Sequence, residues 1–301
     1  MLKRWDVLGV GCNSVDYVYR VPAPPLADSP TAKLRIREHA TMCGGQMATA
    51  MAACSSFGLR AAYLGAVGDD QNGRLVLSEL ERRGVDTSLV MTRPCPNRFA
   101  VITVDPNGDR IVLWDRDDRL NLTTSDIDRG VIPLARLLHV DDEDPEAAIT
   151  AALVARDAGV PSTSDIDRVT DRTAALIDAV TIPIFAQHVP SEMTGVANLE
   201  RAVRKLRKPH HELVGVTLGA SGAALLVGDA WLVDAPPPVA AVDTTGAGDV
   251  FRAALIYARL SGYQPRELLR FANAAAALSC TRRGALPGVP SLEDVQRFTG
   301  G

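Results

Sequence analysis

The stretch Val242-Asp-Thr-Thr-Gly-Ala-Gly-Asp-Val-Phe251 is a turn of small residues that runs directly into an apolar, helix-like segment. Its centre, Gly246-Ala247-Gly248, has almost no side chain, so a ligand can approach the main chain closely. Unpaired N–H groups and the dipole of the following helix both favour an anion at this turn. Asp249 would repel such an anion, but it suits a base that deprotonates a hydroxyl while the N–H groups stabilise a transferring phosphoryl group. The alternative is a tight strand-to-helix turn with a capping Asp.

The composition is that of a chain with one large core. It has 301 residues, of which 47% are hydrophobic, and a net charge of −4 with both signs scattered along it. This charge disfavours nucleic acid or an anionic membrane as a partner. The five cysteines form no Cys-x-x-Cys pair, which indicates reduced thiols. No segment approaches the roughly 18 apolar residues of a membrane span, and the start lacks a signal peptide, so we expect a soluble, cytoplasmic protein.

Strand and helix patterns divide the chain into two kinds of region. In the second half, buried strands alternate with helices, which predicts a parallel sheet covered on both faces. In the first half, strands are predicted at 15–21 and 33–41. A hairpin is predicted from 99–105 and 110–114, around a Pro-Asn-Gly-Asp turn. These four early strands would form a small sheet separate from the main one.

Two signatures indicate a family. Asp243-Thr-Thr-Gly-Ala-Gly-Asp249 resembles the C-terminal signature of the ribokinase-like (PfkB) carbohydrate kinases, and Gly44 to Gly73 resembles their N-terminal signature. The likeness extends from Asp16 to about Val289, with both signatures in the expected order. There is no Gly-x-x-x-x-Gly-Lys-[Ser/Thr] segment, which excludes a P-loop kinase.

The resemblance implies a fold and an activity. The expected fold is an α/β, three-layer α/β/α sandwich with a mainly parallel central sheet, in one domain over 1–301. A small β-sheet lid, built from about 15–41 and 98–118, would cover the substrate. The expected activity is transfer of the γ-phosphate of ATP to a hydroxyl of a small sugar or sugar-like polyol. Mg²⁺ would accompany the nucleotide, and homodimers would form through the lids.

The resemblance also implies roles for individual residues. The catalytic set is the base Asp249 with the backbone N–H groups of Gly246, Ala247 and Gly248. The expected contacts to the sugar are Asp16, Gly44, Gly45, Thr49 and Glu143. The expected contacts to ATP are Thr217, Gly219, Ser221, Gly222 and Asn273. A K⁺ ion would be held mainly through backbone carbonyls by Asp243, Thr245, Ser279, Arg282 and Gly284.

The chain departs from the family pattern at two places. Thr49 stands where ribokinases carry a sugar-contacting Asn, and its shorter side chain disfavours ribose. The Asn-x-x-Glu motif linked to magnesium reads Ala186 and Val189, with Glu192 slightly downstream. The carboxylate that organises the metal is therefore missing or relocated. Of the acidic run 141–144, we expect all but Glu143 to be helix-capping, solvated surface.

Other functions stay open. A nucleoside kinase would use the same machinery, although the 5% aromatic content gives little for a base to stack on. A catalytically silent sugar-binding or regulatory protein would explain the altered Asn-x-x-Glu motif, but not the intact Asp249. The stretch 242–284 also resembles the sulfofructose-kinase-like subgroup. Glu143 and Trp114 stand where an anion site would need Arg or Asn, so a neutral sugar is expected.

Overall fold

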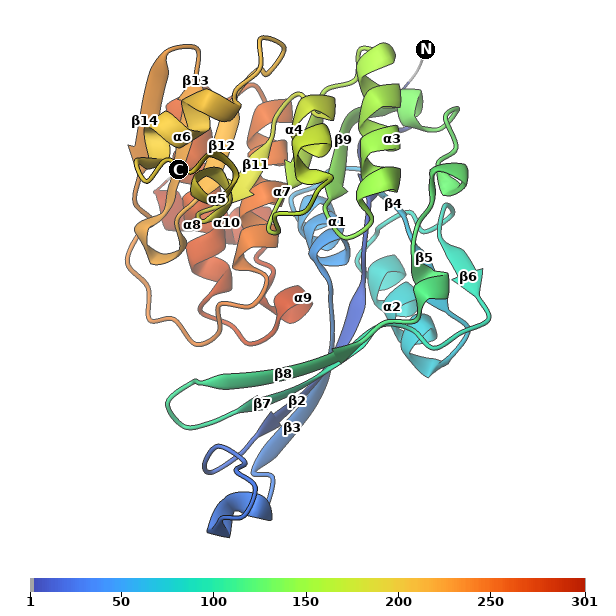
Figure 1. Ribbon diagram of the computed structural model, residues 1–301, viewed down its shortest axis with the longest axis vertical. Coiled ribbons are helices and arrows are strands. Elements are labelled where there is room, and N and C mark those ends of the chain that lie inside the picture. Colours follow the sequence, from blue (N-terminus) through green and yellow to red (C-terminus); the bar gives the residue numbers. More distant parts are fainter. Residues whose placement is uncertain (1–2, 301) are drawn as a thin grey trace.

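The computed structural model describes residues 3–300, so residues 1–2 and 301 of the predicted domain lie outside the described part. Two four-stranded sheets, β10-β9-β1-β4 and β11-β12-β13-β14, form the centre of the molecule (Figure 1). Bridges between β10 and β11 join them into one sheet. Its strands are β1 Trp5–Val10, β4 Ala61–Leu64, β9 Ala135–Asp141, β10 Ser162–Asp165, β11 Ile184–Ala186, β12 Val214–Thr217, β13 Ala223–Val227 and β14 Ala230–Asp234. The strand pairs from β4 to β12 are parallel, whereas β13 runs antiparallel to both of its neighbours, β12 and β14.

Helices cover both faces of this sheet. One layer contains α1 Gln46–Ser56, α2 Gln71–Arg82, α7 Ala247–Leu260, α8 Pro265–Ser279, α9 Ala285–Gly288 and α10 Leu292–Thr299. The other, in front in Figure 1, contains α3 Pro145–Asp157, α4 Thr173–Ala179, α5 Val189–Thr194 and α6 Leu199–Leu206. Because side chains alternate along a strand, Val7 and Leu8 of β1 pack into the two separate cores. The predicted three-layer sandwich is confirmed.

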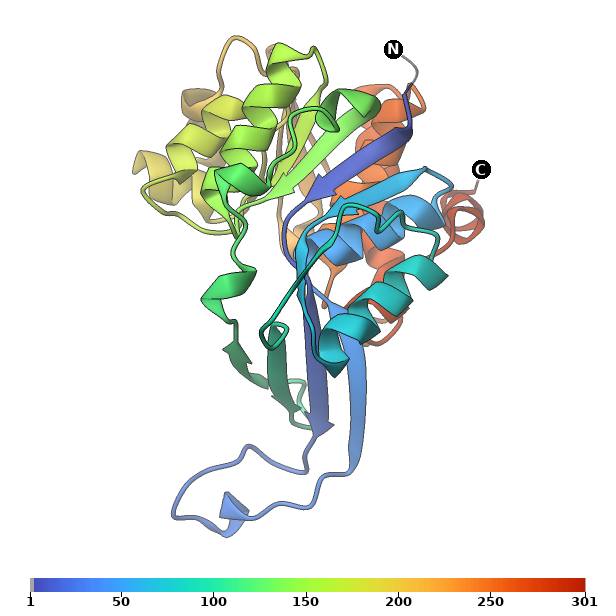
Figure 2. The ribbon, with the colours of Figure 1, turned by 90° about the vertical axis from the view of Figure 1, so that its right-hand side faces the viewer.

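A second sheet, which we call the small sheet, projects from the main body (Figures 1 and 2). Its order is β3-β2-β7-β8, with β2 Ser14–Arg20, β3 Glu38–Gly44, β7 Phe99–Val104 and β8 Arg110–Asp115. The predicted strand 33–41 has the wrong bounds, because β3 begins where Glu38 pairs with Arg20, the last residue of β2. A short two-stranded sheet, β5 Ala66–Gly68 and β6 Met91–Arg93, lies beside α2.

Helix boundaries follow from caps that the hydrophobic pattern did not reveal. The amphipathic pattern of residues 74–84 predicts a helix that starts at Arg74, but helix α2 begins at Gln71, three residues earlier. The reason is Asp70, whose Oδ1 accepts the N–H of Gly73 at 2.9 Å and so starts the helix earlier. Helix α3 ends at Asp157, slightly short of the predicted Gly159. No helix within residues 3–300 is long and apolar enough to cross a membrane.

Candidate active site

The turn before α7 is held in a conformation that requires glycine. Gly246 has φ +80°, and a Cβ there would lie 2.9 Å from the Cα of Ala285. Asp243 fixes the turn from one side, since its Oδ1 accepts the N–H and the Oγ1–H of Thr245 at 3.0 and 2.7 Å. Its Oδ2 accepts the N–H of Gly284 at 3.0 Å. Burial opposes ionisation of Asp243, but these hydrogen bonds outweigh it and lower its pKa.

The turn leaves backbone N–H groups free at the start of α7. Ala247 donates a long hydrogen bond of 3.3 Å to the carbonyl of Thr244, and Val250 donates to Gly246 at 2.9 Å. The N–H groups of Gly246, Gly248 and Asp249 have no acceptor among residues 3–300. One of the three predicted catalytic amides, that of Ala247, is thus partly used by the turn. The others form an open anion site at the helix N-terminus.

Asp249 faces a cavity of about 600 Å³, which we call the Asp16 cavity. Gly246, Gly248 and Asp249 line it from α7, and Asp16 lines it from the small sheet. The carboxylate of Asp249 has no hydrogen bond or ion pair within the described range 3–300. Burial raises its pKa well above the ordinary value, and the nearby charge of Asp165 raises it further. A free carboxylate with a raised pKa is a suitable proton acceptor.

A second cavity, of about 790 Å³, lies on the other side of the turn and is called the Asn273 cavity. Of the residues predicted to contact ATP, Thr217, Gly219, Gly222 and Asn273 line it. Ser221 is exposed and does not line it. Gly248 and Thr217 line both cavities, so two ligands bound side by side would meet at the free amides of α7.

The residues predicted to contact the sugar are only partly brought together. Asp16, Gly45 and Glu143 line the Asp16 cavity. Gly44 makes room for Asp16, since a Cβ at Gly44 would lie 2.7 Å from its Oδ2. Thr49 is fully buried and does not line the cavity. A Cβ at Gly246 would lie 3.3 Å from its methyl group, so Thr49 packs beneath the turn.

The acidic run 141–144 is not the solvated surface that the sequence suggested. Asp141, Asp142 and Asp144 are all buried. Glu143 forms ion pairs with Arg98 at 2.9 Å, Arg116 at 3.0 Å and Arg168 at 2.8 Å. Burial opposes ionisation of Glu143, but the guanidinium groups outweigh it and lower its pKa.

These arginines also correct the argument for a neutral substrate. Arg98 and Arg168 line the Asp16 cavity together with Glu143 and Trp114. The cavity therefore contains Arg side chains of the kind that an anion site would need. The expectation of a neutral sugar considered only Glu143 and Trp114. Sequence reasoning missed the arginines because ion pairs between distant segments leave no local pattern.

A further ion pair lies beneath the turn. Arg252 of α7 is buried and pairs with Asp165, at the end of β10, at 2.5 Å. Both residues line the Asp16 cavity. The signal that could have revealed the pair is an Arg inside the otherwise apolar run 250–258, because a buried guanidinium requires an anionic partner.

The predicted cation site fits backbone ligands better than side chains. The carbonyl oxygens of Ser279 and Arg282 lie 3.3 and 3.9 Å from the position that a Cβ on Gly288 would fill. The Ser279 hydroxyl donates to the Ala276 carbonyl, and Arg282 pairs with Asp294, so both side chains are engaged elsewhere. A monovalent cation would therefore be held by carbonyls, as the resemblance implies.

The described part of the chain has no preformed metal site made of side chains alone. Residues 3–300 contain no group of three or more His, Cys, Asp or Glu side chains arranged to hold a metal. Glu192 is exposed on α5 and lines neither cavity. The metal-organising carboxylate of the Asn-x-x-Glu motif thus has no substitute at this position.

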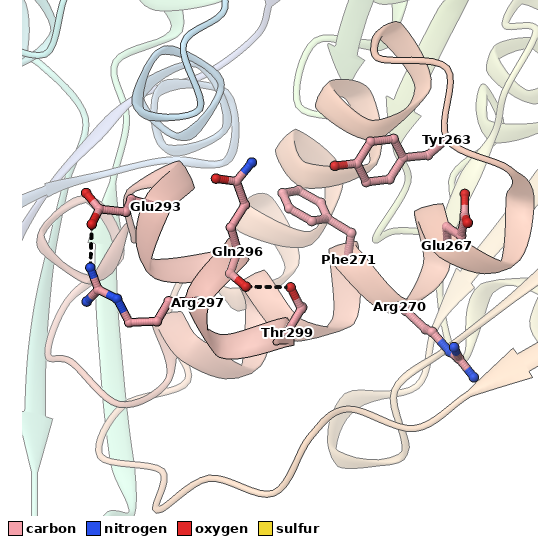
Figure 3. Close-up of a pocket in the computed structure, with 8 residues that line it drawn as sticks. All are labelled: Tyr263, Glu267, Arg270, Phe271, Glu293, Gln296, Arg297 and Thr299. Carbon is pink, nitrogen blue, oxygen red and sulfur yellow. Dashed lines mark hydrogen bonds and ion pairs between the residues drawn. The ribbon is translucent and has the colours of Figure 1, made fainter. Parts of the chain in front are cut away.

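A third cavity, of about 640 Å³, lies away from the turn between α8 and α10 (Figure 3). The ring of Phe271 lies at its centre, with the phenol of Tyr263 beside it. Arg297 pairs there with Glu293. None of the predicted site residues lines this cavity.

Comparison with known proteins gives a consistent result. The model of the family described as "pfkB family carbohydrate kinase" matches residues 13–292. An ATP-dependent ribose-1-phosphate kinase of Halopiger xanaduensis is 30% identical, with 97% of each chain covered. A nucleoside kinase of Methanothermobacter thermautotrophicus is 28% identical, covering 99% of this chain and 97% of its own length. The structure of Arabidopsis thaliana ribokinase complexed with ribose and ATP superposes with a TM-score of 0.86 at 26% identity, with 99% of each chain covered.

Proposed function

Because the chain belongs to the pfkB carbohydrate kinase family, whose relatives here are sugar and nucleoside kinases, we propose that it is an ATP-dependent sugar kinase. The acceptor is a hydroxyl of a small sugar or sugar-like polyol. The observation that carries this proposal is the junction of two cavities at Gly248, with a free carboxylate on one side. Such a junction suits direct transfer between two ligands that are held in line.

In the proposed reaction the acceptor occupies the Asp16 cavity and ATP occupies the Asn273 cavity. Asp249 takes the proton of the acceptor hydroxyl as its oxygen bonds to the γ-phosphorus. The bond from that phosphorus to the bridging oxygen breaks, and ADP leaves with the electron pair. The free N–H groups of Gly246 and Gly248 stabilise the charge on the transferring group. Asp16 and Gly45 hold the sugar.

We expect Mg²⁺ and K⁺ to be bound in different ways. Residues 3–300 hold no cluster of three or more side chains that could bind a metal, and Mg²⁺ commonly keeps water and phosphate ligands, so we expect Mg²⁺ to arrive bound to the phosphates of ATP. Carbonyls near Gly288 suit a K⁺ ion, which would stabilise the loop that carries Gly284 and, through Asp243, the turn.

The small sheet is proposed to act as the lid of the Asp16 cavity. Ala100, Ile102 and Trp114 line the cavity from β7 and β8. Arg110 of β8 donates to the Thr245 hydroxyl at 2.7 Å and so connects the small sheet to the turn. A lid that excludes water would limit hydrolysis of ATP. We also propose a homodimer through β8, an edge strand whose apolar residues 111–114 are 44–65% exposed.

A nucleoside is the second candidate acceptor. The identity to the Methanothermobacter enzyme favours it, and so does Trp114, whose side chain lines the Asp16 cavity and offers a ring for a base to stack on. Turnover on a panel of sugars, sugar phosphates and nucleosides would separate the two candidates. Release of ADP on any of them would also exclude a silent binding protein.

The proposed base is tested by Asp249→Asn. We expect kcat to fall by roughly 10²–10⁴-fold, because an amide cannot accept the hydroxyl proton. ATP should still bind with nearly unchanged affinity in calorimetry. Asp167→Asn is the matched control, since Asp167 also lines the Asp16 cavity. Near-normal turnover of Asp249→Asn, or an equal loss in both variants, would contradict the assignment.

A further inference from the structure

Arg252 stands out as the one charged residue in the run 250–258 of α7. It lies three residues after Asp249, so the two side chains project from the same face of the helix. Its side chain is 5% exposed, and its neighbours in the sequence, Phe251 and Ala253, belong to the hydrophobic core. A guanidinium in such a place is costly unless an anion balances it.

Asp165 supplies that anion, but the pair is incompletely satisfied. The Nη2 of Arg252 lies 2.5 Å from Oδ1 of Asp165, whose side chain is 3% exposed. Nε of Arg252 nevertheless has no hydrogen-bond partner within residues 3–300.

The guanidinium lies directly against the anion site. A Cβ on Gly248 would be 2.8 Å from Nη1 of Arg252, so the glycine leaves the space that the guanidinium occupies. Arg252, Asp165 and Asp249 all line the Asp16 cavity. Arg252 is therefore placed between the buried acid and the turn that carries the free amides.

The other charged groups around Asp249 are acids. Asp165 ends β10, Asp167 follows it, and Asp141 ends β9. His139 of β9 does not add positive charge, because burial and the charge of Arg252 lower its pKa to about 3. Arg168 also lines the cavity, but it is paired with Asp142 and Glu143.

We infer that Arg252 is a positioning residue that keeps Asp249 ionised, and that Asp165 holds its guanidinium against Gly248. This inference rests on the proposed role of Asp249 as the base. The electrostatics agree with it. Burial and the charge of Asp165 raise the pKa of Asp249, and the charge of Arg252 opposes both.

The test is the pH dependence of kcat/KM in variants of this pair. In Arg252→Gln, loss of the positive charge should move the acid limb to higher pH by about one unit or more, with about a tenfold loss at pH values below the limb. Arg252→Lys keeps the charge and should restore most of the wild-type profile. Asp165→Asn removes a negative charge and should move the limb to lower pH. A role in packing alone would not produce shifts of opposite sign.

Each outcome decides the inference. An acid limb that is unchanged in folded Arg252→Gln, or Gln and Lys variants that are equally impaired, would overturn it. If Arg252→Gln does not fold, the pH dependence of kcat/KM is measured instead in three other variants. These are Arg252→Lys, Asp165→Asn and the charge-neutral double variant Asp165→Asn/Arg252→Gln. Should Asp249→Asn keep its turnover, the proposed function fails. If Asp249→Asn is inactive while no variant shifts the limb, only the inference about Arg252 fails.

Discussion

The acids around the two ends of the Asp16 cavity differ in how they are paired with arginines. At one end, Glu143 is paired with Arg98, Arg116 and Arg168, and Asp144 and Asp142 pair with the last two of these. We call this the arginine-rich end. At the acid-rich end, Asp249 experiences the charges of Asp165 and Asp141, and the one guanidinium there, that of Arg252, is paired with Asp165.

The pKa values follow this difference. At the arginine-rich end the cations lower the pKa of Glu143 despite its burial. At the acid-rich end burial raises the pKa of Asp249, and it raises those of Asp165 and Asp141 to about 7. Removing one partner of a buried ion pair destabilises a fold, whereas buried acids that lack a partner are costly themselves and are typical of sites that move protons. The arginine-rich end therefore has the charge pattern of a structural ion-pair network, and the acid-rich end has that of the proposed proton-transfer site.

The largest expected effect is at the arginine-rich end. Glu143→Gln would leave Arg98 without its anion, while Arg116 and Arg168 would keep Asp144 and Asp142, and we expect a loss of roughly 2–3 kcal/mol in the free energy of unfolding. Urea denaturation followed by circular dichroism would measure it. The matched control is Asp249→Asn, the same acid-to-amide change at the acid-rich end. It removes a carboxylate that has no hydrogen bond or ion pair within residues 3–300, and it should raise the unfolding midpoint. Destabilisation of both variants by similar amounts would break the comparison.

The fold could be predicted because its signals are local. Alternating strands and helices and the turn 242–251 indicated the sandwich, and the hairpin around 106–109 indicated the small sheet. The bounds of β3 and α2 were wrong because they depend on pairing with Arg20 and on the cap at Asp70.

The candidate site was predicted only in part, for a related reason. Sequence motifs identified Asp249, Gly248 and Asn273, which the structure brings to adjoining cavities. The ion pairs of Glu143 and Arg252 join residues that are far apart in the chain, so no spacing rule reveals them. The burial of each acid, which sets its pKa, is likewise a property of the assembled fold.

The second prediction concerns Asp141 at the acid-rich end. Its Oδ2 accepts the N–H of Cys12 at 2.8 Å, and burial together with Asp142 and Asp144 raises its pKa from 3.8 to about 7. In the unfolded chain Asp141 loses its proton near pH 3.8, whereas in the folded protein it keeps it until about pH 7. The stability that this group contributes is therefore complete at low pH and is lost as the pH rises through this window.

Asp141→Asn should remove that dependence. Relative to the variant, the wild-type protein is expected to lose about 2 kcal/mol of unfolding free energy between about pH 5 and pH 7. Denaturation curves at a series of pH values would measure the difference in slope. Glu143→Gln is the control, because it retains Asp141 and should lose stability over this pH window as the wild-type protein does. If the unfolding free energies of the wild-type protein and of Asp141→Asn changed with pH in parallel, Asp141 would be ionised in the folded protein and its charge would be compensated there.

The smallest effect is expected at Asp16, which lies between the two ends. Its Oδ1 accepts the hydroxyl of Ser14 at 3.1 Å, and its carboxylate lines the cavity from β2. Burial raises its pKa, with Arg98 opposing this rise from one side and Asp243 adding to it from the other. If Asp16 binds sugar hydroxyls, as proposed, Asp16→Asn weakens charged hydrogen bonds that are present in both the ground state and the transition state. The KM of the acceptor should then rise by about 10–100-fold while kcat changes little. Ser14→Ala is the control, and its KM should change far less. A fall in kcat with unchanged KM would instead assign Asp16 to the proton-transfer end, and the division of the cavity into two ends would have to be redrawn.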